Sequence, residues 1–328
     1  MNLLEIAKTK CIAFKGTISH QGLEAVVHHV EIAERHFENG KALGEYFYTD
    51  VIYRTNQAFE GALKEAFRLL AGLDSSKMSP YQIEKILETK GLLKARVLSQ
   101  FTNYRTEWRN KSTHDYQLFF SSQEALLAIV SVTAFFNILL DQMLEKHAFD
   151  LEKARIETMA SQVFSDVQNY DGLGFLQQCV QLLLHFSRDS DDKQINFVDV
   201  SEYELIGKLT GFIAAADPLI DIATDEMVEA GGHKHRADIV LEKSACKVVV
   251  EVKRASIEPL RRIRDGIEQV KKYMNALNVE HGIVFLSPRV ANVEFDITYM
   301  NEEINDAATH IAVVAPKKML RAPRHLEQ

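Results

Sequence analysis

The sequence predicts a two-domain protein in which an all-α helical bundle is followed by an α/β domain with a mixed sheet. The first half of the 328 residues shows apolar side chains at three- and four-residue spacing, which is typical of helices. After the polar stretch from Ser187 to Lys193, short apolar runs alternate with helical patterns. A chain of this length is also long enough for two separate cores.

In the first half, helices are expected at residues 22–38, 43–73, 80–108, 122–147, 151–167 and 172–186. Asn39-Gly40 predicts a turn, and Ser121 with Glu124 has the spacing of a capping box that opens a helix. The expected domains are residues 1–187, with a core at about 46–143 that the helices of 151–187 extend, and residues 198–328. Residues 188–197 are expected to link them.

The second domain is expected to begin with a capped helix from Ser201 to about residue 216. Strands are expected near residues 219–223, 235–241 and 247–253, followed by a helix at about 257–277 and strands at 281–286 and 310–314. The order helix, three strands, helix, strand is typical of a small α/β domain with a mixed sheet.

Composition favours an ordinary globular protein, with 46% hydrophobic and 26% charged residues. Three distant cysteines give neither a disulfide framework nor a zinc pattern. The amino terminus has no signal-peptide pattern, and the apolar run of residues 125–140 is short and interrupted by polar residues, so a cytoplasmic location is expected. The net charge of −8 argues against a uniformly basic surface, but basic residues gather locally at Lys253, Arg254, Arg261, Arg262, Arg264, Lys271 and Lys272.

Two carboxylates and a lysine are expected to meet on the sheet of the second domain. Glu251 and Lys253 are two residues apart on one strand, so their side chains lie on the same face. A hairpin can bring Asp238, on the neighbouring strand, beside Glu251. Such a set suits a divalent cation and an attacking water, and it therefore predicts metal-dependent phosphodiester hydrolysis. Alternating charges on a surface strand are the simpler alternative.

Residues 198–314 resemble the PD-(D/E)xK nuclease superfamily, of the restriction-endonuclease-like kind. The resemblance rests on Asp238, on Glu251-Val252-Lys253, and on the segment from Gln269 to Tyr273, although Ala237 stands where the motif has proline. It implies that Glu204, Asp238 and Glu251 hold Mg²⁺ or Mn²⁺. It also implies that Lys253 and Gln269 orient water or phosphate. Arg254, Lys271 and Tyr273 are the expected nucleic-acid contacts.

Arg109-Asn110-Lys111-Ser112-Thr113-His114 lies between two expected helices of the first domain. Residues 46–143 resemble a HEPN domain, whose R-x4-6-H signature falls at such a junction. The resemblance implies metal-independent RNA cleavage, in which His114 is the general acid or base, Arg109 stabilises the charged phosphorane and Asn110 positions the phosphate. It also implies a homodimer through the helical domain. A plain helix end capped by basic groups is the alternative.

The sequence thus predicts a nuclease of the defence or restriction type. The leading hypothesis is Mg²⁺-dependent DNA cleavage by the second domain. A metal-independent ribonuclease is the first alternative, and a non-catalytic nucleic-acid-binding dimer is the second. The segment from Gly231 to His235 could contact nucleic acid or could be an exposed hairpin, and His28, His29 and His36 are expected on a helix surface.

Overall fold

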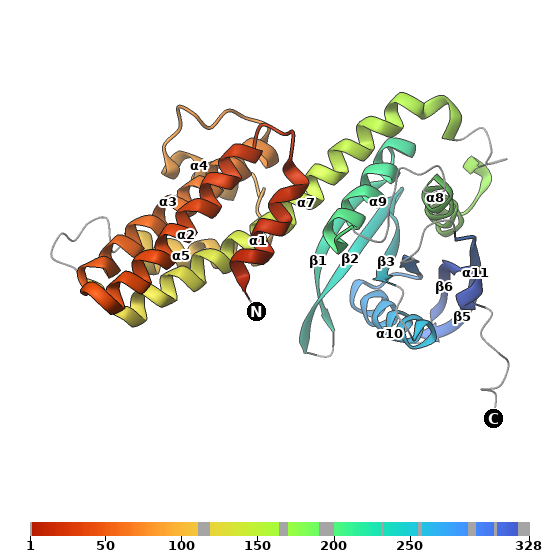
Figure 1. Ribbon diagram of the computed structural model, residues 1–328. Helices are drawn as coiled ribbons and strands as arrows, with labels where there is room; N and C mark the ends of the chain where they lie inside the picture. The colour runs from red at the N-terminus through yellow and green to blue at the C-terminus, as the bar shows by residue number, and fades with distance from the viewer. Residues whose placement is uncertain are drawn as a thin grey trace. The chain divides into compact units, whose positions relative to one another are not determined.

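The computed structural model describes residues 2–110, 119–163, 170–189, 200–230, 232–254, 258–287, 293–304 and 307–320 (Figure 1). Two compact units, Met1–His147 and Ala148–Gln328, divide the chain. The first is helical and the second contains a six-stranded mixed sheet. The predicted two-part architecture is therefore confirmed.

The first unit is built from α1 (Leu3–Cys11), η1 (Ile12–Phe14), α2 (His20–Leu43), α3 (Tyr46–Ala71), α4 (Pro80–Thr89), α5 (Ala95–Tyr104), the π-helical η2 (Arg105–Arg109) and the first part of α7 (Ser122–Val163). Aromatic rings hold its core together. The ring of Phe59 lies 4.6 Å from that of Tyr104, 5.6 Å from that of Phe101 and 5.1 Å from that of Phe135. Such ring pairs add to the stabilisation that apolar burial provides.

Several helix boundaries differ from the sequence prediction. Helix α2 continues through Asn39-Gly40, where a turn was expected, and ends at Leu43. The helix expected at residues 80–108 is broken after Thr89, because Gly91 adopts a left-handed conformation with φ of 60°. The side chain of Gln142 holds the connecting loop by accepting a bond from Lys94 N and donating one to Leu92 O. Conversely, the helix expected at 122–147 and the described part of the one expected at 151–167 belong to the single helix α7, which ends at Val163.

Helix α7 is long and apolar enough over Ser122–Thr158 to cross a membrane by length and composition alone. However, 67% of its most apolar window is buried inside the protein. This degree of burial is the pattern of a core helix, which agrees with the expectation that residues 125–140 do not span a membrane.

The second unit contains the end of α7, η3 (Tyr170–Gly172), α8 (Phe175–Asp189), α9 (Glu202–Ala216), α10 (Pro259–Leu277), α11 (Lys317–Leu320) and six strands. The strands are β1 (Asp221–Ala230), β2 (His233–Lys243), β3 (Cys246–Arg254), β4 (His281–Ser287), β5 (Phe295–Ile304) and β6 (Ala307–Pro316). The expected order of helix, three strands, helix and strand is confirmed, whereas β5 was not predicted.

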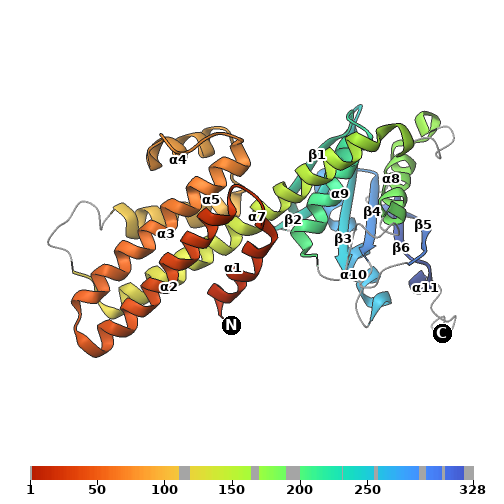
Figure 2. The same ribbon diagram turned by 45° about the horizontal axis from the view of Figure 1, so that its top comes forward.

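The sheet has the strand order β1-β2-β3-β4-β6-β5. Its first three strands are antiparallel neighbours, β3, β4 and β6 run parallel, and β5 is antiparallel to β6. Helices α8 and α9 pack on one face of the sheet, and α10 packs on the other (Figure 2). The sheet is therefore buried on both faces, as its parallel centre requires.

The domain boundary also differs from the prediction. Ile156 of α7 and residues of α8 from Leu176 to Phe186 belong to the same apolar core as the sheet. The helices of residues 151–187 therefore extend the second unit, not the first, and the division falls inside α7 instead of at residues 188–197.

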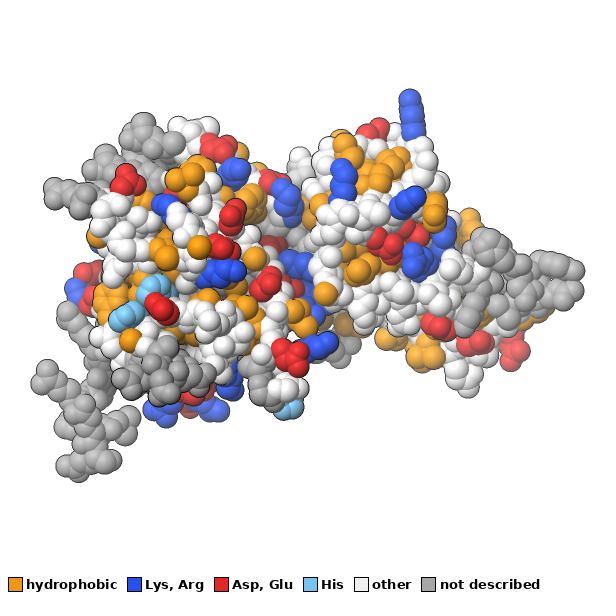
Figure 3. Space-filling view, turned by 180° about the vertical axis from the view of Figure 1, so that it is seen from behind, with side chains coloured by type: hydrophobic (Ala, Val, Ile, Leu, Met, Phe, Trp, Pro, Cys, Tyr) orange, Lys and Arg blue, Asp and Glu red, His pale blue; other side chains and the backbone are white. Residues whose placement is uncertain are grey.

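Charged side chains of both signs are mixed on the face of each unit that Figure 3 shows, with blue basic and red acidic groups lying close together. This mixture fits the modest net charge of −8 on 328 residues. On this face, any attraction for nucleic acid would be local and would not come from a broad field of one sign.

Candidate active site

The second unit brings Asp238, Glu251 and Lys253 to the face of the sheet that α10 covers. Strands β2 and β3 pair with Ile239 opposite Val250, so the next residues outward, Asp238 and Glu251, face each other. Val250 and Val252 lie on the opposite face, in the core with α8 and α9. The predicted alternation of β3 is therefore confirmed, because an extended strand sends successive side chains to opposite faces.

The two carboxyl groups are buried and repel each other. Burial, together with the charge of Glu251, raises the pKa of Asp238 to about 7. Burial also raises the pKa of Glu251, a residue that is only 2% exposed, while the hydrogen bond from Lys253 works in the opposite direction. A proton shared between the two carboxyls, or a bound cation, would relieve the repulsion.

Two hydrogen bonds fix the orientation of these carboxylates. Lys253 Nζ lies 2.5 Å from Glu251 Oε1, which places a positive charge directly beside the pair. The backbone N–H of Val252 donates to Asp238 Oδ2 at 2.8 Å. The Asp238 side chain thus takes the place that a strand partner would have beyond the last β2–β3 pair.

The donor set fits a hard divalent cation. With both carboxyls ionised, Glu251 Oε2 is buried and has no hydrogen-bond partner among the described residues. A buried carboxylate oxygen without a partner lowers the stability of the folded protein unless a cation or a proton binds to it. Within the described ranges, no group of three or more His, Cys, Asp or Glu side chains is arranged to hold a metal ion. A cation here would therefore have few protein ligands and several waters, as Mg²⁺ accepts.

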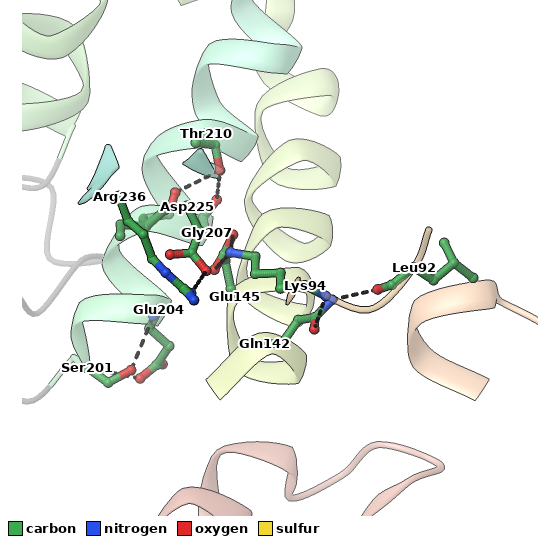
Figure 4. A network of polar contacts seen from close by, with 11 residues as sticks. Leu92, Lys94, Gln142, Glu145, Ser201, Glu204, Gly207, Thr210, Asp225 and Arg236 are labelled. Atoms are coloured by element: carbon green, nitrogen blue, oxygen red, sulfur yellow. Dashed lines mark hydrogen bonds and ion pairs between the residues drawn. The ribbon is translucent and has the colours of Figure 1, made fainter. Parts of the chain in front are cut away.

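Glu204, which is expected to hold the metal, caps the helix on which it lies, and its role as a metal ligand stays a prediction. It forms a capping box at the start of α9, in which Ser201 N donates to Glu204 Oε2 and Glu204 N donates to Ser201 Oγ, both at 3.2 Å (Figure 4). A second α9 carboxylate, Glu202, adds through its charge to the rise in the pKa values of Asp238 and Glu251, after the larger effect of burial. The capping pattern of the sequence did signal Glu204, but as a cap and not as a ligand.

Helix α10 covers the carboxylate pair and contributes Gln269 and Tyr273. A Cβ atom at Gly266 would lie 3.5 Å from Lys253 Cγ, so this turn of the helix touches the site lysine. Tyr273 is 4% exposed, and burial with the charges of Glu251 and Asp238 raises its pKa. Gln269 is half-buried. It is three residues after Gly266 and four before Tyr273, so it lies on the same side of the helix as these two residues.

The expected nucleic-acid contacts are placed unequally. Arg254 is half-buried at the end of β3, next to the site. Lys271 is also half-buried and donates to Glu268 at 3.4 Å. The burial of Tyr273 makes it part of the wall of the site, so it does not offer the open ring surface that stacking on a base requires.

The arginine expected to act on RNA lies in a carboxylate cluster of the first unit. Arg109 Nε is 3.4 Å from Glu60 Oε1, and one of its terminal nitrogens is 3.9 Å from Glu84 Oε1. Glu84 is 2% exposed, its pKa is raised by burial, and it also pairs with Arg105 at 3.5 Å. Asn110 is exposed at the end of η2. His114 lies outside the described residues, so its position relative to Arg109 stays a prediction.

Two histidines of β2, His233 and His235, lie near Tyr273 of the site wall. The His235 ring lies 6.4 Å from the Tyr273 ring, and the His233 ring lies 6.5 Å from that of His235. Both belong to the segment before Asp238 for which the sequence left a nucleic-acid contact or a hairpin open. The structure has a β1–β2 hairpin here, and β2 begins at His233, two residues before the expected strand.

Comparison of the chain with protein-family models, with curated proteins and with solved structures finds no match.

Proposed function

We propose that the second unit is a metal-dependent nuclease that hydrolyses phosphodiester bonds in DNA. The observation that carries the proposal is the buried pair of Asp238 and Glu251 with Lys253 at 2.5 Å from Glu251. Two repelling carboxylates beside an ammonium are unfavourable in an empty apolar site, but they suit a site that binds a cation and a phosphate. The resemblance to PD-(D/E)xK nucleases supports the same assignment.

Asp238 and Glu251 would hold Mg²⁺ or Mn²⁺, and Glu202 would add negative charge from α9. When bound, the ion would neutralise the scissile phosphate and acidify a water. Lys253 lies beside Glu251, where its amino group would orient the attacking water and stabilise the charge that develops on phosphate oxygen. Gln269 would position the phosphate from α10. The buried wall around Tyr273 would restrict water near the reacting groups.

The decisive experiment measures cleavage of labelled duplex DNA by the full chain with Mg²⁺, with Mn²⁺ or with EDTA. Asp238→Asn, Glu251→Gln and Lys253→Ala are each expected to lower the metal-dependent rate at least about 100-fold. Glu242→Gln and Lys247→Ala are matched controls, because this exposed pair lies on the same two strands, 3.1 Å apart, away from the site. Undiminished cleavage in the three site variants would refute the proposal.

A second candidate is metal-independent RNA cleavage by the first unit, acting as a homodimer. It is favoured by the π-helical turn η2, which ends at Arg109, because such turns occur frequently at functional sites. RNA cleavage should then persist in EDTA and fall in Arg109→Ala and His114→Ala, and the chain should sediment as a dimer. Binding of nucleic acid without cleavage would instead favour a regulatory protein. A cytoplasmic defence role is part of these proposals by association alone.

A further inference from the structure

The β1–β2 hairpin is interrupted directly opposite the site aspartate. Paired residues run from Asp221 opposite Glu242 to Thr224 opposite Ile239 and resume at Glu226 opposite Ala237. The position between these pairs is occupied by Asp225 on β1 and Asp238 on β2. Asp225 has a φ of 60°, a left-handed conformation that is unusual inside a strand.

Both strands change face at this interruption. On β2, Ala237 and Val240 pack in the same apolar cluster with Tyr273, although they are three residues apart. On β1, Ala223 and Val228 contact that cluster at a spacing of five. Regular strands return to one face at even spacings only, so the alternation is reversed in both strands between these residues.

The interruption releases Asp238 from a regular ladder position. The β2–β3 pairs end at Ile239 opposite Val250, and beyond them the Asp238 carboxylate accepts the Val252 N–H at 2.8 Å. A regular β2 would place a backbone carbonyl near that amide. The register with β3 already places Asp238 opposite Glu251, and the altered strand lets its side chain accept the Val252 N–H in place of a backbone carbonyl.

An ion pair holds the unusual residue in place. Arg236 lies two residues before Asp238 and donates to Asp225 Oδ2 at 3.1 Å, across the hairpin (Figure 4). The Asp225 side chain is only 15% exposed, which strengthens such a pair relative to one in open solvent.

We propose that Asp225 is a positioning residue: its left-handed backbone, held by Arg236, turns the Asp238 carboxylate onto the Val252 N–H, and so fixes it in the place beside Glu251 that the β2–β3 register gives it. The effect on cleavage rests on the proposed nuclease function, whereas the effect on Asp238 does not. Asp225 touches neither the metal nor the substrate in this scheme. It acts entirely through the geometry of the hairpin.

Three substitutions separate the backbone conformation from the charge. Asp225→Gly and Asp225→Asn can both adopt the left-handed conformation, and asparagine also keeps the shape of the side chain. Asp225→Val cannot adopt it without strain, because its side chain is branched at Cβ. The valine variant is therefore expected to extend β1 into a regular ladder.

The first measurement is amide hydrogen exchange at Val252 in the metal-free full chain. Protection of this amide should fall at least about tenfold in Asp225→Val and stay near wild type in Asp225→Asn and Asp225→Gly. The amides of Val249 and Val250 serve as internal references for an intact sheet. Retained protection in Asp225→Val, or equal loss in all three variants, would overturn the proposal.

The second measurement is the DNA-cleavage rate of the same variants. Asp225→Val should lower kcat about 10- to 100-fold with KM within a factor of about two, and Asp225→Asn should restore kcat. A parallel change of kcat and of the amount of folded protein would indicate simple destabilisation and would count against positioning. An inactive wild type with Asp225-dependent protection of Val252 would refute the nuclease but support the positioning.

Discussion

At the scale of single residues, the defining feature is a pair of carboxyls that the fold places together without full compensation. Asp238 and Glu251 face each other on β2 and β3, and burial opposes the ionisation of both. Lys253 compensates one of the two charges. The metal-free protein therefore stores electrostatic repulsion that a cation would release, and this repulsion should be measurable as a dependence of stability on pH.

The free energy of unfolding of the metal-free protein should contain a term from Asp238 that falls with pH. The folded pKa of Asp238 is about 7 and its ordinary value is 3.8, so between these pH values the folded state binds the proton that the unfolded state has lost. Stability then decreases as pH rises through this window. Asp238→Asn should therefore gain roughly 1–3 kcal/mol relative to wild type between pH 5 and pH 8, as measured by urea unfolding in EDTA.

Asp265→Asn is the control for this measurement, because Asp265 is exposed on α10. The difference in free energy of unfolding between the Asp265→Asn variant and wild type should stay constant with pH over the same range. If Asp238→Asn showed the same flat difference, the buried repulsion between the two carboxyls would be disproved.

At the scale of secondary-structure elements, α9 and α7 approach each other closely enough for backbones to touch. A Cβ atom at Gly211 of α9 would lie only 2.4 Å from the carbonyl oxygen of Phe149 in α7. Since a backbone oxygen cannot move aside as a flexible side chain can, only glycine fits there. This contact sets α9 against the helix that carries part of the second core.

Gly211→Ala should therefore destabilise the full chain by about 3 kcal/mol, which thermal unfolding would show as a drop of several degrees in Tm. Gly61→Ala in α3 is the matched control, because the added methyl meets only the Val26 side chain and alanine favours a helix. A Gly211→Ala protein as stable as this control would show that the two helices can separate without cost.

The elements also show what the sequence could and could not predict. The strand alternation of β3 predicted the shared face of Glu251 and Lys253, because that face depends only on neighbouring residues. The break at Gly91 and the continuity of α7 were missed, since both depend on packing. The capping pattern after Ser201 predicted the cap that Glu204 forms. The influence of Glu202 on the carboxylate pair was missed, because it depends on where the fold places the start of α9.

At the scale of the whole molecule, attraction for DNA must overcome a net charge of −8. Helix α10 offers a local source of positive charge, because Arg261, Arg262 and Arg264 are exposed near its start and follow the site strand β3 in the chain. Such a group can bind phosphates at short range even on an acidic protein, since charges in solution act over about 10 Å at ordinary salt concentrations.

Replacing these three arginines by alanine should weaken binding of duplex DNA by about 10- to 100-fold at low salt. The number of phosphate contacts, as calculated from the salt dependence of binding, should fall by up to about three. Fluorescence anisotropy in a Lys253→Ala background, which avoids cleavage, would measure both quantities. Lys41, Lys85 and Lys90 replaced together give the same change in net charge on exposed positions of the first unit. An equal loss with this control would show that DNA responds to total charge and not to α10.

The interruption at Asp225 has a consequence for the solubility of the protein as well. Strand β1 is at the edge of the sheet, and the hairpin extends past the neighbouring strands in Figures 1 and 2. A long, regular edge strand can recruit the edge of another molecule and begin aggregation. The left-handed residue disturbs the regularity of this edge, and the exposed Glu226 and Glu229 beyond it would repel an identical strand. The bend that aims a carboxylate inward thus also helps to keep the outer edge from self-association.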